Sequence, residues 1–158
     1  MVISTVRTGK TKMVAYLDGK DLKTIQSKDE PAYEFNDAWD NLALDIKMAL
    51  ATQLGVKDAN LSGFTQDHKM EFAKIHYEYS DDEETPFSYD VWGHHSIIGT
   101  DYDTDIKLHF QFGEKGAPDK AALDIREEAR KYVAKYRGQT SLFEDMDQEE
   151  NGGDKDEG

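Results

Sequence analysis

Apolar and polar residues alternate in two groups of short segments, and each group is followed by a longer segment with a helical period. The first group covers residues 2–8, 11–17 and 20–27, with frequent β-branched and aromatic residues in the first two. Asp18-Gly19, between the last two segments, is a typical hairpin turn. Three consecutive antiparallel strands are therefore expected.

The period then changes to three and four residues over residues 32–54. The apolar positions of this segment fall on one face of a helix, and Gly55 follows as a typical C-terminal cap. Residues 56–67 lack this period and are expected to form a loop. The apolar positions of the helix are Phe35, Ala38, Trp39, Leu42, Ile46, Ala49 and Leu50.

The second group of strand-like segments covers residues 69–79, 87–98 and 104–112. Apolar residues recur at every second position, the period of a strand with one buried face, and Gly93 indicates a bulge in the second segment. The residues expected to point inward are Ala73, Ile75, Tyr77 and Tyr79 in the first segment, Phe87, Tyr89 and Val91 in the second, and Thr104, Ile106, Leu108, Phe110 and Phe112 in the third.

A second helix is expected over residues 118–137, where Pro118 suits the first turn and Gly138 ends the pattern. The element order βββα-βββα predicts an α+β fold, in which an antiparallel sheet of about six strands carries both helices on one face. The chain is then a single domain at residues 1–137 with a disordered acidic tail at residues 138–158. The apolar stripe of the second helix is Ile125, Ala129, Tyr132, Val133 and Tyr136.

The charge of the chain is strongly negative. The 158 residues carry a net charge of −14, and the segment from Glu144 to Gly158, with eight acids and one lysine, contributes −7 of it. The remaining −7 of the body argues against direct nucleic-acid binding, because phosphate contacts need a basic surface. A partner with a basic cleft or a hydrophobic pocket is favoured instead.

The sequence contains no cysteine, no apolar run long enough to cross a membrane and no secretory signal at its start. A cytoplasmic location without membrane attachment is expected. The chain indicates no cofactor, and no set of residues has the spacing of a catalytic centre. A non-enzymatic protein is therefore expected.

Acidic residues before the last strand suggest a metal site at first reading. Asp101, Asp103 and Asp105 have the spacing of the first ligands of a calcium loop. Ile106 and Phe112, however, stand where that loop needs glycine and glutamate. A polar turn that enters a strand is the better interpretation.

The histidines raise the same question. His94 and His95, with His76 and His109, include adjacent residues of one strand, which point to opposite faces and cannot easily share an ion. No metal site is therefore expected, and these histidines are expected on a solvated sheet face. Asp90 and His95 would make an acid–base pair in a cleft, although no spacing singles them out.

Aromatic and basic residues are also expected together on one face of the sheet. Phe72, Lys74, His76 and Trp92 fall on the face opposite Ile75. Exposed aromatic residues on a sheet can stack nucleic-acid bases. The negative charge of the body opposes that function, so partial burial under a loop is favoured.

The segment Gln139-Thr140-Ser141-Leu142-Phe143, just past the second helix, is similar to the peptide that binds the bacterial DNA polymerase sliding clamp. The common form of that peptide is Q-x-[SD]-L-F, and all four specified positions match. Leu142 and Phe143 would enter an apolar pocket of the clamp, and Gln139 would fix the register at its rim. The alternative is that Leu142 and Phe143 fold back on the body and hold the second helix in place.

The wider chain resembles a group of small, mostly uncharacterised proteins of tailed bacteriophages. The shared features are the opening strands, the stretch LDGKDLKTIQSKDEPAYEF, and a closing helix followed by a Q-x-S-L-F peptide. The resemblance covers both ends of the body rather than residues 60–115. It implies a phage or prophage protein that acts in the bacterial cytoplasm near replication or recombination, and it implies no activity.

The expected function is therefore that of a non-enzymatic phage accessory protein. It would bind the bacterial sliding clamp through Gln139, Ser141, Leu142 and Phe143 and so modulate replication or recombination. A first alternative is an acidic decoy that mimics DNA and inhibits a host nuclease or another DNA-binding protein. A second alternative is a single-stranded DNA-binding accessory protein with an acidic regulatory tail.

Overall fold

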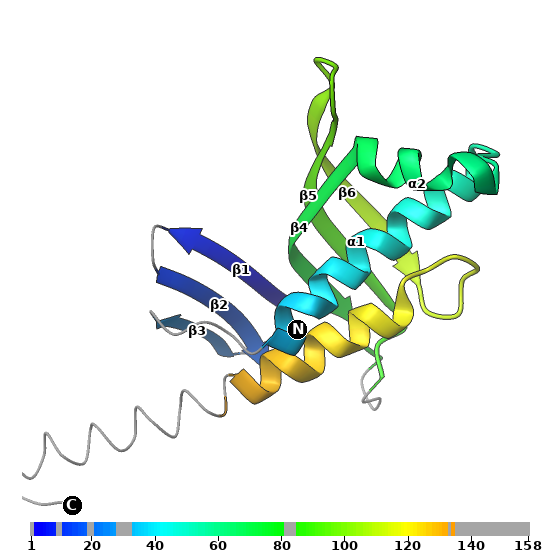
Figure 1. Ribbon diagram of the computed structural model, residues 1–158. Helices are drawn as coiled ribbons and strands as arrows, with labels where there is room; N and C mark the ends of the chain where they lie inside the picture. Colours follow the sequence, from blue (N-terminus) through cyan, green and yellow to red (C-terminus); the bar gives the residue numbers. More distant parts are fainter. Residues whose placement is uncertain are drawn as a thin grey trace, which may run out of the picture.

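A computed structural model of the chain describes residues 2–8, 11–18, 21–27, 33–80, 85–132 and 134, with side chains from residue 33 onward. The helix at residues 119–132 is called the C-terminal helix below. The other described elements are β1 (Val2–Thr8), β2 (Thr11–Asp18), β3 (Asp21–Ser27), α1 (Tyr33–Gln53), α2 (Asp58–Asp67), β4 (His68–Glu78), β5 (Ser88–Ile97) and β6 (Asp103–Gln111) (Figure 1).

The strands pair antiparallel in the order β3-β2-β1-β4-β5-β6. Figure 1 shows α1 and the C-terminal helix lying across β4, β5 and β6, whereas β1, β2 and β3 continue the order beyond β4. β1 joins β4 through three residue pairs, which begin at Val2 and His76 and end at Ser4 and Lys74. The α+β class is therefore confirmed, but the sheet that the helices cover has three antiparallel strands rather than about six.

The segment expected to be a loop at residues 56–67 contains a helix, α2, so the described residues include three helices rather than two. No residue of α2 is buried, which explains why its sequence lacks an apolar stripe. Contacts from other elements hold it instead. Lys47 Nζ donates a hydrogen bond to the Thr65 carbonyl at 3.0 Å, and the Ile98 backbone N–H donates to the Asp67 carbonyl at 2.9 Å.

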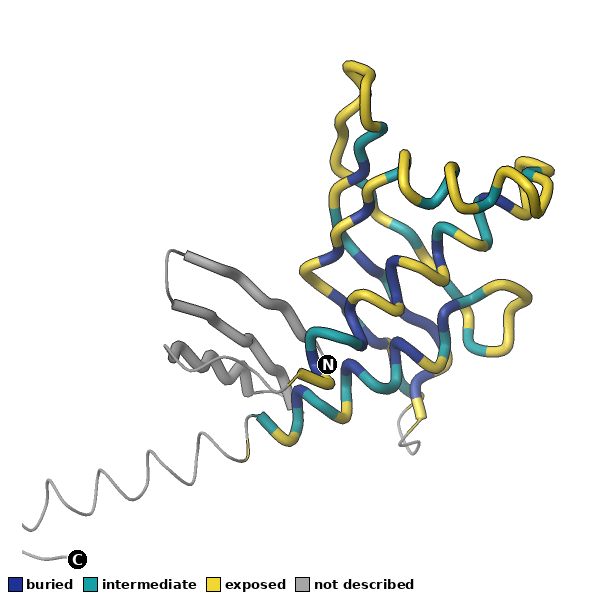
Figure 2. Tube along the Cα trace, in the orientation of Figure 1, coloured by how far each residue is buried: buried dark blue, intermediate teal, exposed yellow. Residues whose placement is uncertain are grey.

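The core lies between the three-stranded sheet and the two long helices. Figure 2 shows the buried positions along the inner sides of both helices and along β4 and β5. The predicted apolar stripe of α1 is confirmed, with Ala49 and Leu50 at its partly buried end. The buried apolar residues of this core are Phe35, Ala38, Trp39, Leu42, Ala43, Ile46, Met70, Phe72, Ile75, Tyr77, Tyr89, Val91, Ala121, Ala122, Ile125 and Ala129.

A β-bulge in β4 changes which residues face the core. The pairing with β5 shifts between Phe72 and Lys74, so Ala73 is an extra residue in β4. Phe72 is buried and Ala73 is exposed, which reverses the expectation for both, while Ile75 is buried as predicted. Gly93 of β5 pairs with Phe72, the residue just before the shift. The bulge that was predicted near Gly93 is therefore present, but it lies in β4 rather than in β5.

Two tyrosine hydroxyl groups tie the C-terminal helix to the sheet. Tyr77 donates a hydrogen bond to the Ala122 carbonyl at 2.5 Å, and Tyr89 donates one to the Asp119 carboxylate at 2.9 Å. Burial raises the pKa of both tyrosines, so both remain protonated donors at any ordinary pH. Asp119 also accepts the Gly113 backbone N–H at 2.8 Å, which fixes the loop before the helix.

Gly93 supplies a direct test of the bulge. A Cβ at this position would overlap the Glu71 carbonyl oxygen and the Phe72 ring, both of which belong to the packed strand. We expect Gly93→Ala to lower the free energy of unfolding by about 2 kcal/mol or more, measured by urea denaturation. Gly63→Ala in α2 is the matched control. A Cβ there meets nothing within 4 Å, so this change should stabilise the helix by about 0.5–1 kcal/mol. Equal effects of the two substitutions would contradict the tight contact at Gly93.

Candidate functional site

The residues of the predicted clamp-binding peptide lie outside the described residues. These residues are Gln139, Ser141, Leu142 and Phe143, and the alternative in which Leu142 and Phe143 pack on the body concerns the same segment. The predicted boundary between residues 1–137 and 138–158 also lies there. The last described residue is Ala134.

The described residues show a second candidate site on the face of β4, β5 and β6 that points away from α1 and the C-terminal helix. Lys74, Trp92 and Lys107 occupy neighbouring positions across the three strands, because Trp92 pairs with Lys74 on one side and with Lys107 on the other. Lys74 Nζ lies 4.4 Å from the centre of the Trp92 ring, and Lys107 Nζ lies 5.1 Å from it. Each such contact at an exposed site is worth about 0.5–1 kcal/mol.

The next row on the same face adds two histidines. His76, Asp90 and His109 are paired across the strands, and His109 Nδ1 lies 2.8 Å from the Asp90 carboxylate. His76 Nδ1 lies 3.5 Å from the Glu78 carboxylate. Asp90 therefore contacts His109 rather than His95, and the acid–base pair considered from the sequence is not formed.

The row of residues on the other side of Trp92 contains more carboxylates than the row of His76, Asp90 and His109. It contains Glu71, His94 and Asp105, and the His94 ring also contacts the Asp103 carboxylate. The hydrogen bond with Asp105, followed by the charge of Asp103, raises the pKa of His94. The described residues contain no group of three or more side chains suited to a metal ion.

His95 points to the opposite face from His94, as the alternation of a strand predicts, but it is buried rather than solvated. His68 Nδ1 lies 3.0 Å from His95 Nε2, and the rings of Phe64 and Tyr102 pack on the two histidines from either side. Burial, followed by the charges of His68 and His94, lowers the pKa of His95. The pair joins α2, β4 and β5 and depends on a neutral ring that can accept the hydrogen bond.

The sequence did not single out His68, because the partnership arises from strand pairing. His95 pairs directly with Met70 in β4, two positions beyond His68 on the same face. The side chains therefore meet diagonally across the strands, a relation that only the register reveals.

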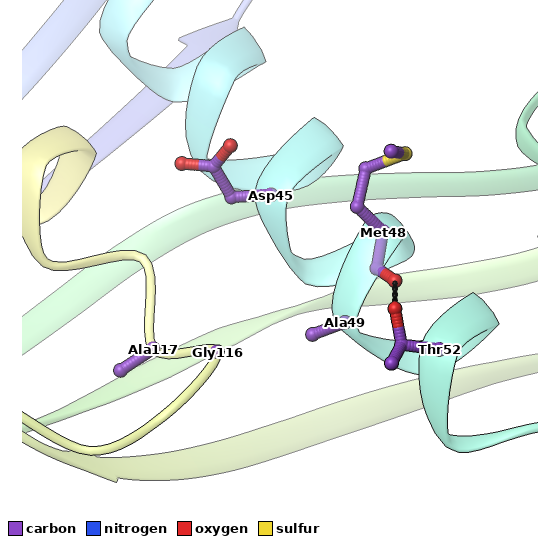
Figure 3. Close-up of a pocket in the computed structure, with 6 residues that line it drawn as sticks. All are labelled: Asp45, Met48, Ala49, Thr52, Gly116 and Ala117. Atoms are coloured by element: carbon purple, nitrogen blue, oxygen red, sulfur yellow. Dashed lines mark hydrogen bonds between the residues drawn. The ribbon is translucent and has the colours of Figure 1, made fainter.

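A surface hollow of about 320 Å³ lies between α1 and the loop before the C-terminal helix (Figure 3). The Ala49 side chain points toward Gly116, and the Thr52 hydroxyl donates a hydrogen bond within α1 to the Met48 carbonyl at 3.0 Å. Partial burial raises the pKa of the Asp45 carboxyl, and Lys120 opposes that shift. Asp45 is the one ionisable side chain that lines the hollow; the other lining residues are Met48, Ala49, Thr52, Gly116 and Ala117.

None of the family models, curated proteins or solved structures compared with this chain matches it. Within the described residues, every helix is too short or too polar to cross a lipid bilayer.

The His68–His95 pair predicts a specific dependence of stability on pH. Because the folded state lowers the pKa of His95 below 6.5, the unfolded chain takes up that proton more readily than the folded one. The contribution of the neutral His95 ring to the free energy of unfolding is fully present above pH 6.5, and it is lost as the pH falls below that value. We expect His95→Gln to make the decline in unfolding free energy on acidification less steep, as measured by urea denaturation at a series of pH values.

His94→Gln is the matched control, because it should change the pH dependence of the unfolding free energy in the opposite direction. The raised pKa of His94 gives stability that is present below pH 6.5 and lost as the pH rises through the folded-state pKa. Removing His94 should therefore make the decline on acidification steeper than in the parent. A His95→Gln protein whose stability follows the parent curve would show that the buried pair is not titrated on unfolding.

Proposed function

We propose that this chain is a non-enzymatic accessory protein of the bacteriophage type that docks on a bacterial sliding clamp through Gln139, Ser141, Leu142 and Phe143. It would act in the cytoplasm of the host bacterium, either by recruiting the clamp to phage replication or recombination or by occupying the site that host polymerases use. The observation that carries the proposal is the sequence QTSLF, in which all four specified positions of the clamp-binding peptide are present.

The composition around the peptide supports a role in binding. Leu142 and Phe143 are followed by fifteen residues with eight acids, one lysine and one further large apolar side chain, Met146. Burying two large apolar side chains in a partner pocket is worth about 3–6 kcal/mol before the cost of ordering the peptide. A contact of this size suits a reversible complex with a dissociation constant on the order of micromolar.

The described part of the C-terminal helix is compatible with a binding peptide that follows it in the sequence. The inner side of the C-terminal helix packs in the core through Ala122, Ile125 and Ala129. Hydrogen bonds from two tyrosine hydroxyl groups hold its first turns. Gln139 follows Ala134, the last described residue, after four intervening positions. The motif therefore begins a few positions along the sequence from a helix whose buried apolar side chains belong to the core.

The acidic decoy is the second candidate function. The observation in its favour is that Asp37 and Asp40, three positions apart on α1, are not buried, and carboxylates on one helix face can imitate successive phosphates. The C-terminal helix favours it less, because Asp124, Glu127 and Glu128 are paired there with lysine or arginine side chains.

Binding of the full-length chain to a purified bacterial sliding clamp tests the first candidate. We expect the double substitution Leu142→Ala and Phe143→Ala to abolish binding, because two apolar anchors carry most of a small interface. Gln139→Ala should weaken it about tenfold through the loss of one hydrogen bond at the rim. Fluorescence anisotropy of the labelled chain would measure both effects.

Met146→Ala is the matched control, since it removes an apolar side chain from the same acidic segment but lies outside the motif. It should leave the affinity unchanged, and added salt should matter much less than the double substitution. The decoy function predicts the reverse pattern toward its own target, with steep salt dependence and indifference to Leu142 and Phe143. Equal clamp affinity of the parent and the double variant would rule out the proposed site.

A further inference from the structure

Two lysines lie one on either side of Trp92 in an acidic protein. The chain as a whole has a net charge of −14. On the face of β4, β5 and β6 that points away from the long helices, however, two lysines flank Trp92, and the adjacent row holds His76 and His109 with Asp90 between them. The side chain of His109 is 54% exposed, Lys74 and Lys107 are exposed, and Trp92 is partly exposed. Solvent and a ligand can therefore reach this cluster.

We propose that this face binds single-stranded nucleic acid, with Trp92 as the surface on which a base stacks and Lys74 and Lys107 as the contacts to phosphates. Aromatic side chains flanked by cations on an open sheet are the usual elements of such sites. The proposal is independent of the clamp-binding peptide, since it rests on different residues and a different ligand.

Charge complementarity selects the ligand. A nucleic-acid strand joins an aromatic base to an anionic phosphate at every unit, which matches one indole placed between two ammonium groups. Lys74 and Lys107 stand two strands apart, which corresponds to about 10 Å between their backbones. Their flexible side chains can reach phosphates on either side of a stacked base.

The lysines lie over the Trp92 ring in the unbound protein, so a base must displace at least one of them. Each exposed cation–π contact contributes about two- to fivefold in an equilibrium constant. Stacking of one base on an aromatic side chain contributes about 5- to 150-fold, and the displaced lysine gains a phosphate partner. The exchange therefore favours the bound state.

The acidic remainder of the chain favours a single strand over a duplex. Duplex DNA carries one charge per about 1.7 Å of its axis, twice the density of one strand, and is repelled more strongly by a negative protein. Its bases are also stacked and paired, so that Trp92, a single side chain on a sheet surface, cannot reach their faces. Glu71 and Asp105 in one adjacent row, and Asp90 in the other, would disfavour phosphates there and so confine the strand to the row of Lys74, Trp92 and Lys107.

The test is a titration of the full-length chain with a labelled oligothymidylate of about 12 nucleotides at low salt, followed by anisotropy. Trp92→Ala should weaken binding about 5- to 150-fold, whereas Trp92→Phe, which keeps a ring, should retain most of it. The intrinsic fluorescence should be quenched on binding in the parent and not in Trp92→Phe, because the remaining tryptophan, Trp39, is buried in the core.

The lysines are tested by the salt dependence. The double substitution Lys74→Gln and Lys107→Gln should reduce the slope of log K against log salt by about 1.4, the value for two phosphate contacts on a single strand. Lys57→Gln with Lys115→Gln makes the same change of charge at two exposed lysines outside this face and should leave the slope unchanged. Thermal unfolding of each variant shows that it is folded.

The proposal is overturned if the parent shows neither binding nor quenching at low salt. It is also overturned if Trp92→Ala binds as tightly as the parent, or if the control lysine pair changes the slope as much as Lys74 and Lys107 do. A change in sedimentation mass on Trp92→Ala without oligonucleotide binding would assign the face to self-association instead. Leu142→Ala with Phe143→Ala should leave oligonucleotide binding intact, which separates this proposal from the clamp-binding one.

Discussion

The close approach of β4 to Gly93 determines which side chains reach each face of the sheet. Because Ala73 is an extra residue in β4, positions 70 and 72 face the helices on one side of the bulge and positions 75 and 77 do so on the other. A regular strand would have turned position 74 into the core and Tyr77 out of it. The bulge therefore places Tyr77 where it can bond the C-terminal helix and places Lys74 beside Trp92.

The periods of apolar residues predicted the helices that bury one face and the strands that contain no β-bulge. The apolar stripe of α1 and the alternation along β6 follow directly from the side-chain periods of a helix and a strand. The faces of β4 could not be predicted in the same way, since one extra residue reverses the alternation without changing the composition. The helix α2 was missed because its contacts come from Lys47 and Ile98, which lie outside its own sequence.

The two candidate sites differ in how far the sequence could reveal them. A linear peptide is read directly, so the residues from Gln139 to Phe143 could be proposed without a structure. The cluster around Trp92 is built from three strands, and its members are brought together only by the register. Lys107 and His109 were expected to point outward on β6, but nothing in the sequence pairs them with residues 92 and 90.

The position of β6 at the end of the strand order has a consequence for the behaviour of the protein at high concentration. An edge strand offers its backbone as a template on which another chain can add a strand. Asp103, Asp105, Lys107 and His109 alternate along this edge, and a docking strand would have to desolvate them. The same charged positions therefore act as gatekeepers that oppose edge-to-edge aggregation.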